Sequence, residues 1–192
     1  MRRGVQLLGG LTIFGFSLGL MLEAHLGLGS WDVLHQGIAE RLGVGIGWVV
    51  IGVGAVTLAA WLALGERAGV GTVANVVLVG IAVDASVAVL STPATLPVRI
   101  AFLLAGIVLN AVATGLYIGA GLGPGPRDGL MTAFAARGHS LRAVRTVIEL
   151  TVLAAGVLLG GEVGPGTLLF AVAIGPLTQF FLPRLTIPWS DR

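Results

Sequence analysis

The sequence predicts an all-α membrane protein with six transmembrane helices, arranged as two inverted three-helix repeats that each carry an extra short helix. Three observations predict this fold class. Hydrophobic residues make up 56% of the chain and charged residues only 10%, which is too little polar surface for a soluble domain of this size. Six apolar stretches are long enough to cross a bilayer. Two sequence landmarks recur in the same order in both halves of the chain.

The six expected spans are apolar stretches of about 20 residues, the length that a helix needs to cross the hydrocarbon core. They cover residues 5–26, 45–64, 70–90, 97–118, 141–159 and 166–182. The start of the chain, Met1-Arg2-Arg3, imitates a signal peptide. The apolar run that follows is too long for one and has no small-residue cleavage site, so we interpret it as the first span.

A short helix is expected after the first span of each half, at residues 31–42 and 127–137. Ser30 is a suitable N-cap for the first of them. An apolar stripe at helical spacing begins at Trp31, and polar residues occupy the other side of the helix. Both segments are too short to cross the membrane. A helix lying along the membrane surface and a re-entrant helix both agree with the pattern.

The two halves, residues 1–96 and 97–192, are interpreted as copies of one three-span repeat that together form one membrane domain. The landmarks are Gly27-Leu28-Gly29 with Asp32, Thr72 and Gly80 in the first copy, and Gly121-Leu122-Gly123 with Asp128, Thr167 and Gly175 in the second. Two extra residues separate the glycines from the aspartate in the second copy. Because three is an odd number of spans, the second copy enters the membrane from the opposite side and is inverted. The loop at Asp32 is then expected to face outward and the loop at Asp128 inward.

The distribution of arginines predicts the orientation, because cytoplasmic loops carry an excess of positive charge. All the basic residues of the chain are arginine. With the N-terminus in the cytoplasm, only Arg41 and Arg99 fall outside. Both termini are therefore expected to be cytoplasmic.

Several classes of function are not supported by the composition. The chain has no cysteine, which removes thiolate catalysis and thiolate metal sites. It has no catalytic or phosphate-binding motif, and its three dispersed histidines do not suggest a metal centre. No basic cluster suggests nucleic acid. We therefore expect no enzyme activity, no metal and no cofactor.

The candidate functional residues are polar groups in or beside the apolar spans, where a charge costs roughly 2.5–3.5 kcal/mol or more. The primary candidates for solute binding or proton coupling are Asp32, His35, Gln36, Asp84, Arg127, Asp128, Arg145, Glu149 and Gln179. Asn75 and Trp31 are secondary candidates.

Asp32, His35 and Gln36 project from one helix face, since they are spaced at i, i+3 and i+4. Such a trio can bind a cation, an amine or a proton. The structural alternative for Asp32 and for its counterpart Asp128 is stabilisation of a helix N-terminus, worth about 0.3–1 kcal/mol.

The remaining candidates also have structural alternatives. Asp84 corresponds to Gln179 in the repeat, and it points away from Asn75, so the two cannot line one cavity unless the helix is broken between them. Asn75 is equally suited to an interhelical hydrogen bond. Glu149 can form a local salt bridge with Arg145 at i+4 or act with it as a gate or proton-coupling pair.

Glycine and proline mark further points of the spans. The Gly-x-x-x-Gly patterns at residues 15–19 and 115–119 predict faces for close helix packing. Pro176, which follows Gly175, predicts a kink in the last span.

The chain resembles the YczE branch of the YczE/YyaS/YitT family of bacterial integral membrane proteins. The resemblance covers nearly the whole chain and rests on the string Gly27 to Gly37 (GLGSWDVLHQG), on GTVANV from Gly71, on GPRDGLM from Gly125, on RTVIE from Arg145, and on Gly166-Thr167 with Gly175-Pro176. It implies a multi-pass protein of the bacterial inner (plasma) membrane. A transport role is mostly presumed for the family.

These observations predict a small secondary transporter or exporter that moves a small polar or charged solute by alternating access. Its expected partners are the lipid bilayer, the solute and a possible second copy in a homodimer. The alternative is a non-transporting accessory protein that binds or stabilises a partner enzyme or complex.

Overall fold

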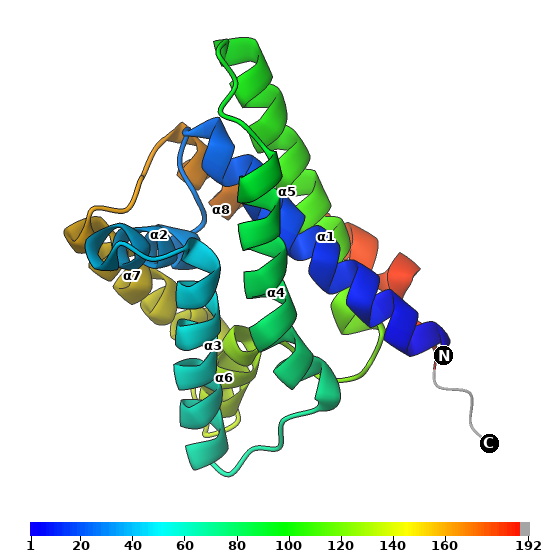
Figure 1. Ribbon diagram of the computed structural model, residues 1–192. Helices are drawn as coiled ribbons and strands as arrows, with labels where there is room; N and C mark the ends of the chain where they lie inside the picture. The colour runs from blue at the N-terminus through cyan, green and yellow to red at the C-terminus, as the bar shows by residue number, and fades with distance from the viewer. Residues whose placement is uncertain (189–192) are drawn as a thin grey trace.

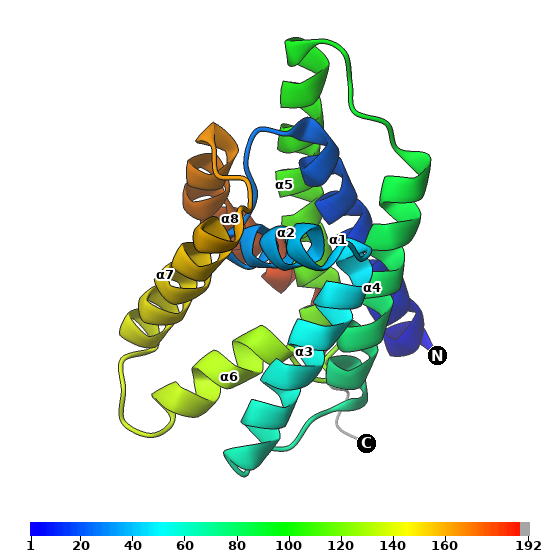
Figure 2. The same ribbon diagram turned by 60° about the vertical axis from the view of Figure 1, so that its left-hand side comes forward.

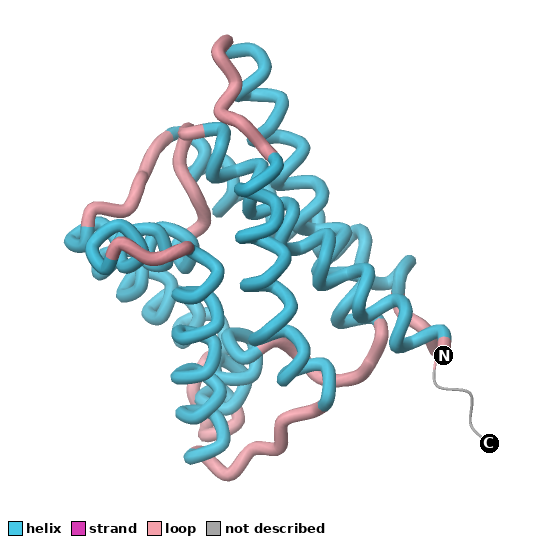
Figure 3. The backbone as a smooth tube through the Cα atoms, in the orientation of Figure 1, coloured by secondary structure: helices cyan, strands magenta, loops and turns pink. Residues whose placement is uncertain are grey.

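The computed structural model describes residues 1–188, which form eight α-helices and no strand (Figures 1 and 3). The helices are α1 (Arg2–Ala24), α2 (Ser30–Leu42), α3 (Ile46–Ala63), α4 (Val70–Val89), α5 (Leu96–Gly119), α6 (Pro126–Ala135), α7 (Leu141–Leu159) and α8 (Pro165–Leu185). The all-α prediction is confirmed, and each expected helix is found within a few residues of its predicted bounds. The last predicted span is unbroken, since α8 continues through Pro176.

Five of these helices, α1, α3, α4, α5 and α8, are long and apolar enough to cross a membrane. Helix α7, which was predicted as the fifth of the six spans, is not among them. It has 19 residues, but it carries three charged residues, Arg142, Arg145 and Glu149. The multi-pass character therefore follows from composition, whereas the count of six does not.

Helices α1 and α5 cross in the middle of the molecule and run antiparallel (Figure 1). The Arg3 guanidinium, at the start of α1, donates to the Ala120 carbonyl at 2.7 Å, and that of Arg99, near the start of α5, donates to the Ala24 carbonyl at 2.6 Å. Each arginine thus closes the C-terminal end of the other helix, where carbonyls lack intrahelical partners.

Glycines allow the long helices to approach one another. A Cβ on Gly15 of α1 would lie 2.4 Å from the Ala82 Cβ of α4, and a Cβ on Gly119 of α5 would lie 2.6 Å from the Leu185 carbonyl oxygen of α8. Both distances are too short for any other residue type. The predicted packing faces at residues 15–19 and 115–119 are confirmed as the contacts of α1 with α4 and of α5 with α8.

The short helices pack against the opposite half of the chain. Helix α2 contacts α7, and α6 contacts α3, and both short helices lie across the longer ones (Figure 2). Arg41 at the end of α2 donates to the Leu159 carbonyl at 3.1 Å, and Arg137 after α6 donates to the Leu64 carbonyl. The backbone links have the same form, since Gly166 donates to Leu26 at 2.7 Å and Gly71 to Leu122 at 2.8 Å.

The paired contacts correct the predicted alignment of the two landmarks. Counterparts lie 95 or 96 positions apart throughout, so Gly27 matches Gly123 rather than Gly121. Both adopt the left-handed backbone that favours glycine, with φ of 101° and 120°. No insertion precedes the second aspartate; the Gly-Leu-Gly strings are similar by sequence but not equivalent in space.

One pair of contacts is not repeated. Helix α3 packs closely on α4, where the Gly47 amide donates to Asp84 Oδ1 at 2.7 Å and a Cβ on Gly80 would lie 2.5 Å from the Gly47 carbonyl oxygen. Helix α7 does not pack on α8 in this way. A Cβ on Gly175, the counterpart of Gly80, would have nothing within 4 Å.

The outside of the bundle is apolar, as a membrane protein requires. Leu158, Val172 and Val56 are 78%, 75% and 72% exposed. Along α2 the apolar stripe runs from Trp31, which is buried, to Leu42, which is 67% exposed.

Candidate functional site

A cavity of about 290 Å³ lies in the middle of the bundle, and all eight helices contribute to its wall. The sequence candidates that line it are Trp31, Asp32, His35, Asn75, Arg127, Asp128, Arg145, Glu149 and Gln179. The structure therefore brings together nine of the eleven candidate residues, from both halves of the chain. Gln36 and Asp84 do not line it.

The first turn of α2 supplies the most deeply buried polar groups of the wall. Trp31, Asp32 and His35 are 6%, 5% and 2% exposed. Gly29 is the N-cap residue in place of the expected Ser30, and it lets this turn fit, because a Cβ there would lie 2.9 Å from the Phe170 ring and 3.1 Å from Asp32 Oδ2. Helix α2 therefore starts inside the bundle rather than on its surface.

Three side-chain atoms of this turn have no hydrogen-bond partner: Trp31 Nε1, Asp32 Oδ1 and His35 Nδ1. Asp32 Oδ1 and His35 Nδ1 are 3.5 Å apart, which is an ion-pair contact but too long for a well-formed hydrogen bond. Burial lowers the pKa of His35, and the Asp32 carboxylate acts in the opposite direction. Burial therefore favours the neutral imidazole.

The first turn of α6 meets the first turn of α2. Arg127 Nη2 lies 3.7 Å from Asp32 Oδ1, and the Arg127 guanidinium carbon lies 5.2 Å from the centre of the Trp31 ring. The loops at Asp32 and Asp128 were expected on opposite sides of the membrane. That expectation was wrong for the helix starts, because both short helices begin in the interior, where their N-terminal ends meet.

Asp128 is held by a residue that the sequence did not single out. Tyr117 Oη donates to Asp128 Oδ2 at 2.9 Å, and Tyr117 is 3% exposed. Tyr117 is the only tyrosine of the chain and lies one helical turn before a glycine-rich break. This position in the sequence could have identified it as a residue of the interior.

Arg145 and Glu149 of α7 form one side of the cavity. No ion pair joins them within 4 Å in the described part of the chain, so the local salt bridge expected from their spacing is not formed. Arg145 is exposed and Glu149 only partly buried. The cavity therefore reaches the surface of the protein along α7.

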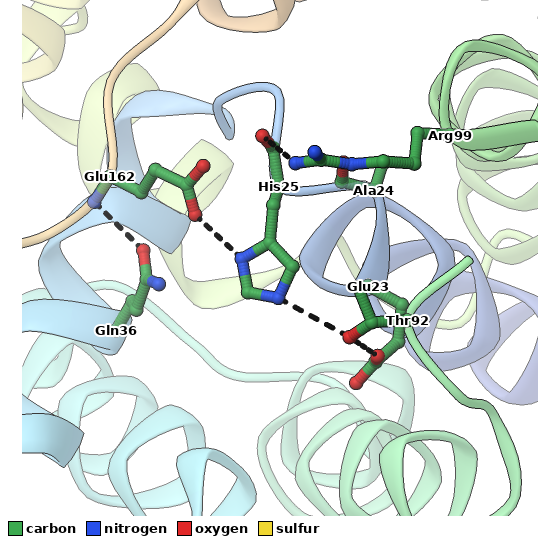
Figure 4. Close-up of polar contacts among 7 residues, drawn as sticks. All are labelled: Glu23, Ala24, His25, Gln36, Thr92, Arg99 and Glu162. Atoms are coloured by element: carbon green, nitrogen blue, oxygen red, sulfur yellow. Dashed lines mark hydrogen bonds and ion pairs between the residues drawn. The ribbon is translucent and has the colours of Figure 1, made fainter. Parts of the chain in front are cut away.

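Asp84 and Gln36 have structural partners outside the cavity. Asp84 accepts the Gly47 amide at the N-terminus of α3, and Gln36 Oε1 accepts the Glu162 amide at 2.8 Å (Figure 4). Asn75 lines the cavity while Asp84 does not, which confirms that these two residues of α4 face different ways. The Asp84 contact satisfies an amide that the start of α3 leaves unpaired, and the Gln36 contact satisfies an amide of the α7–α8 connection.

A second polar cluster lies at the end of α1, outside the cavity (Figure 4). His25 Nδ1 and Glu162 Oε2 are 3.1 Å apart, and the Thr92 hydroxyl donates to Glu23 Oε2 at 2.6 Å. Arg99 donates to the His25 carbonyl at 2.5 Å. The cluster joins the end of α1 to the α4–α5 and α7–α8 connections.

The site therefore combines three carboxylates, two guanidinium groups and one imidazole around one small cavity. Among residues 1–188, no group of three or more His, Asp or Glu side chains is placed to hold a metal ion. The arrangement is suited to binding a small solute that carries charge.

Comparison with known proteins agrees with the membrane character of the chain. The model of a family of unknown function, DUF6198, matches residues 1–183. An uncharacterized protein of Haemophilus influenzae is 41% identical over 177 residues, which cover 92% of this chain and 81% of the relative. The uncharacterized membrane protein YczE of Bacillus subtilis is 35% identical over 180 residues, which cover 91% of this chain and 83% of YczE. No solved structure matches the chain.

Proposed function

The chain belongs to the DUF6198 family and is a multi-pass membrane protein, and on this premise we propose that it is a small secondary transporter. It moves a small polar or charged solute across the bacterial inner membrane by alternating access. The central cavity is the solute site.

The first support for this proposal is a set of contacts that recur in both halves, as an inverted duplication predicts. Apart from the α3–α4 contact, the main contacts of the first half recur in the second at positions 95 or 96 apart, and the corresponding helices α1 and α5 run antiparallel. If both helices cross the bilayer, the axis that relates the halves lies in the membrane plane. Six crossings in two such repeats, with the solute site where the repeats meet, form a common plan of secondary transporters.

The observation that carries the proposal is the asymmetry between the two repeats. Helix α3 is closed on α4 at Gly80, whereas α7 stands away from α8 at the equivalent Gly175. Gly175 lines the cavity, together with Gln179 and with Arg145 of α7. The cavity thus reaches the surface on the side where the repeat contact is missing.

In the opposite state of the transporter, each repeat adopts the conformation that the other repeat has in this structure. Helix α7 then closes on α8 over Gly175, and α3 leaves α4 at Gly80. Gln179 takes the part of its counterpart Asp84 and accepts an amide from the start of α7. A glycine that nothing approaches in one state is needed for close approach in the other.

Paired distance measurements test this exchange. The chain has no cysteine, so spin labels on cysteines at Val147 and Val172 report the α7–α8 distance alone. The matched pair, Gly52 and Val77, reports the α3–α4 distance. We expect each pair to show two distances in lipid nanodiscs, with conditions that shorten one pair lengthening the other.

A single, unchanging distance for both pairs, over a range of pH and added solutes, would refute alternating access. The accessory-protein alternative would then be the better account. A stoichiometric partner recovered on affinity purification, without solute flux in vesicles, would support it.

A further inference from the structure

The polar atoms of the cavity that have no hydrogen-bond partner indicate which donor and acceptor groups a ligand needs. Trp31 Nε1 is a donor that needs an acceptor, and Asp32 Oδ1 is an acceptor that needs a donor. Both residues are at least nine-tenths buried, where a polar atom without a partner costs on the order of 1–3 kcal/mol. The ligand must therefore carry a donor and an acceptor close together.

The charges around these atoms are of both signs. Asp32 Oδ1 and Arg127 Nη2 are 3.7 Å apart without a hydrogen bond between them. A solute with one charge would satisfy one of these groups and compete with the other. A solute with an ammonium and a carboxylate satisfies both, since ion pairs with hydrogen bonds are the stronger kind.

The same distance limits the separation of the ligand charges. Groups that are 3.7 Å apart in the protein are matched by an amine and a carboxylate on one carbon atom, not by charges at the two ends of a chain. The N-terminal ends of α2 and α6 meet at this place and favour the carboxylate end. The Trp31 indole N–H adds a donor for it.

Part of the remaining wall is apolar and is suited to an apolar side chain. Phe14, Val79, Ile118 and Phe170 line the cavity, and its volume of about 290 Å³ is at the lower end of ligand pockets. We propose that the cavity binds an α-amino acid with an apolar side chain, with its ammonium on Asp32 and its carboxylate on Arg127 and the Trp31 indole. This inference names the solute class of the proposed function and rests on it for transport, but not for binding.

Thermal unfolding of the purified protein with four matched probes tests the binding. L-leucine has both charges on one carbon, its isomer 6-aminohexanoate has them at opposite ends, and 4-methylpentanoate and 3-methylbutylamine each lack one charge. A ligand that binds the folded state raises the unfolding temperature. We expect leucine to bind at least tenfold more tightly than each of the other three.

Equal shifts of the unfolding temperature with leucine and 3-methylbutylamine would overturn the inference in favour of a simple cation site. Equal shifts with leucine and 4-methylpentanoate would overturn it in favour of an anion site. Equal shifts with 6-aminohexanoate would overturn the single-carbon geometry. No shift with any probe would mean that water fills the cavity and satisfies its polar atoms.

Variants locate the bound charges. Asp32→Asn and Arg127→Gln should each weaken leucine binding at least tenfold, whereas Glu40→Gln, which removes an exposed carboxylate outside the cavity, should leave affinity unchanged. Trp31→Phe removes only the indole N–H and serves where Asp32→Asn does not fold; we expect it to weaken leucine but not 3-methylbutylamine. Unchanged leucine affinity in Trp31→Phe and Arg127→Gln would overturn the assignment.

The proposed function and this inference can fail separately. Leucine binding with fixed helix distances and no flux would leave the site and remove the transporter. Moving helix distances without leucine binding would leave alternating access and remove the amino-acid ligand.

Discussion

Polar residues of this chain have two different tasks, and the residue type does not distinguish them. Asp84 accepts the backbone amide of Gly47, whereas Asp32 keeps one carboxylate oxygen without a hydrogen bond in the cavity. Arg99 closes the end of α1, whereas Arg127 lies over the Trp31 ring. In a bilayer, backbone groups at helix ends need partners from the protein itself. The first task is therefore structural, and only the second leaves polar atoms available to a solute.

Replacement of Arg99 by glutamine should destabilise the protein. Its guanidinium donates to the carbonyls of Ala24 and His25 at 2.6 and 2.5 Å, and hydrogen bonds from charged donors contribute about 1.5–3 kcal/mol. Because Arg99 is only partly buried, we expect a loss of about 1–2 kcal/mol, measured by unfolding in detergent. Arg142→Gln, at an exposed position of α7, is the charge-matched control. Equal stability of the two variants would contradict the role of Arg99.

Tyr117→Phe isolates the support of Asp128. The change removes the hydroxyl that donates to Asp128 Oδ2 at 2.9 Å and keeps the ring that packs edge-on against Phe14. A partly buried carboxylate then loses a donor, which costs on the order of 1–3 kcal/mol. The unfolding free energy should fall accordingly. Asp128→Asn tests the same contact from the other side, and combining the two changes should cost less than the sum of their separate effects.

The sequence predicted which residues of the site are polar, but not which of them meet. Asp32 and Arg127 lie far apart in sequence, in different halves, and no local pattern relates their side chains. Their contact depends on both short helices starting inside the bundle, which helical periodicity does not encode. The role of Asp84 as a cap was missed for the same reason, because its partner Gly47 belongs to another helix.

At the scale of helices, more of the structure could be predicted from the sequence, because apolar runs and glycine breaks are local signals. The first span was expected at residues 5–26 and is α1 at Arg2–Ala24; the first short helix was expected at 31–42 and is α2 at Ser30–Leu42. The closed α3–α4 and open α7–α8 contacts were not foreseen. Both halves of the chain carry a glycine at this position, Gly80 and Gly175. Only the structure shows that another helix packs closely on Gly80 and none on Gly175.

Gly80→Ala and Gly175→Ala form a matched pair that measures this difference. A Cβ on Gly80 would lie 2.5 Å from both the Gly47 carbonyl oxygen and an Ile51 side-chain carbon, so we expect a loss of about 1–3 kcal/mol from overpacking. Gly175 has open space around it, and alanine there should leave stability within about 1 kcal/mol of the wild type. Equal destabilisation of the two variants, measured by unfolding, would contradict the observed asymmetry.

A larger side chain at Gly175 tests whether α7 closes on α8 without changing the stability of the fold. Gly175→Leu fits the open space of this structure but occupies the surface on which α7 would close. The variant should unfold as the wild type does and should lose the shorter of the two α7–α8 distances between Val147 and Val172. Persistence of that distance in Gly175→Leu would mean that α7 does not approach α8 at this glycine.

At the scale of the whole molecule, the start of the chain lies beside residues 187 and 188, the last that the structure describes. The Arg3 guanidinium donates to the carbonyls of Ile187 and Pro188 at 3.2 and 3.0 Å. An odd number of crossings would place the ends on opposite sides of the membrane. If both ends lie on one side of the membrane, as the proposed topology requires, the five helices that are apolar enough to cross do not suffice, and α7 would be the sixth crossing.

Helix α7 is able to cross despite its charges. Its 19 residues span about 28 Å, close to the thickness of the hydrocarbon core. Arg142 lies at its first turn, where a long side chain reaches the headgroups, and Arg145 and Glu149 line the cavity. The charged residues because of which α7 is not apolar enough to count as a span thus lie where water or a solute is available.

Reporter fusions decide between five and six crossings. Reporters active only in the cytoplasm, attached separately at the N-terminus and the C-terminus, should both be active, because positive charge gathers on that side. A reporter inserted at Thr92, in the α4–α5 connection, should be inactive. Activity at only one terminus would leave α7 outside the count of crossings, and the second repeat would then not be an inverted copy of the first. The exchange between closed and open repeats depends on that inversion, so it would lose its basis even if the cavity still bound a solute.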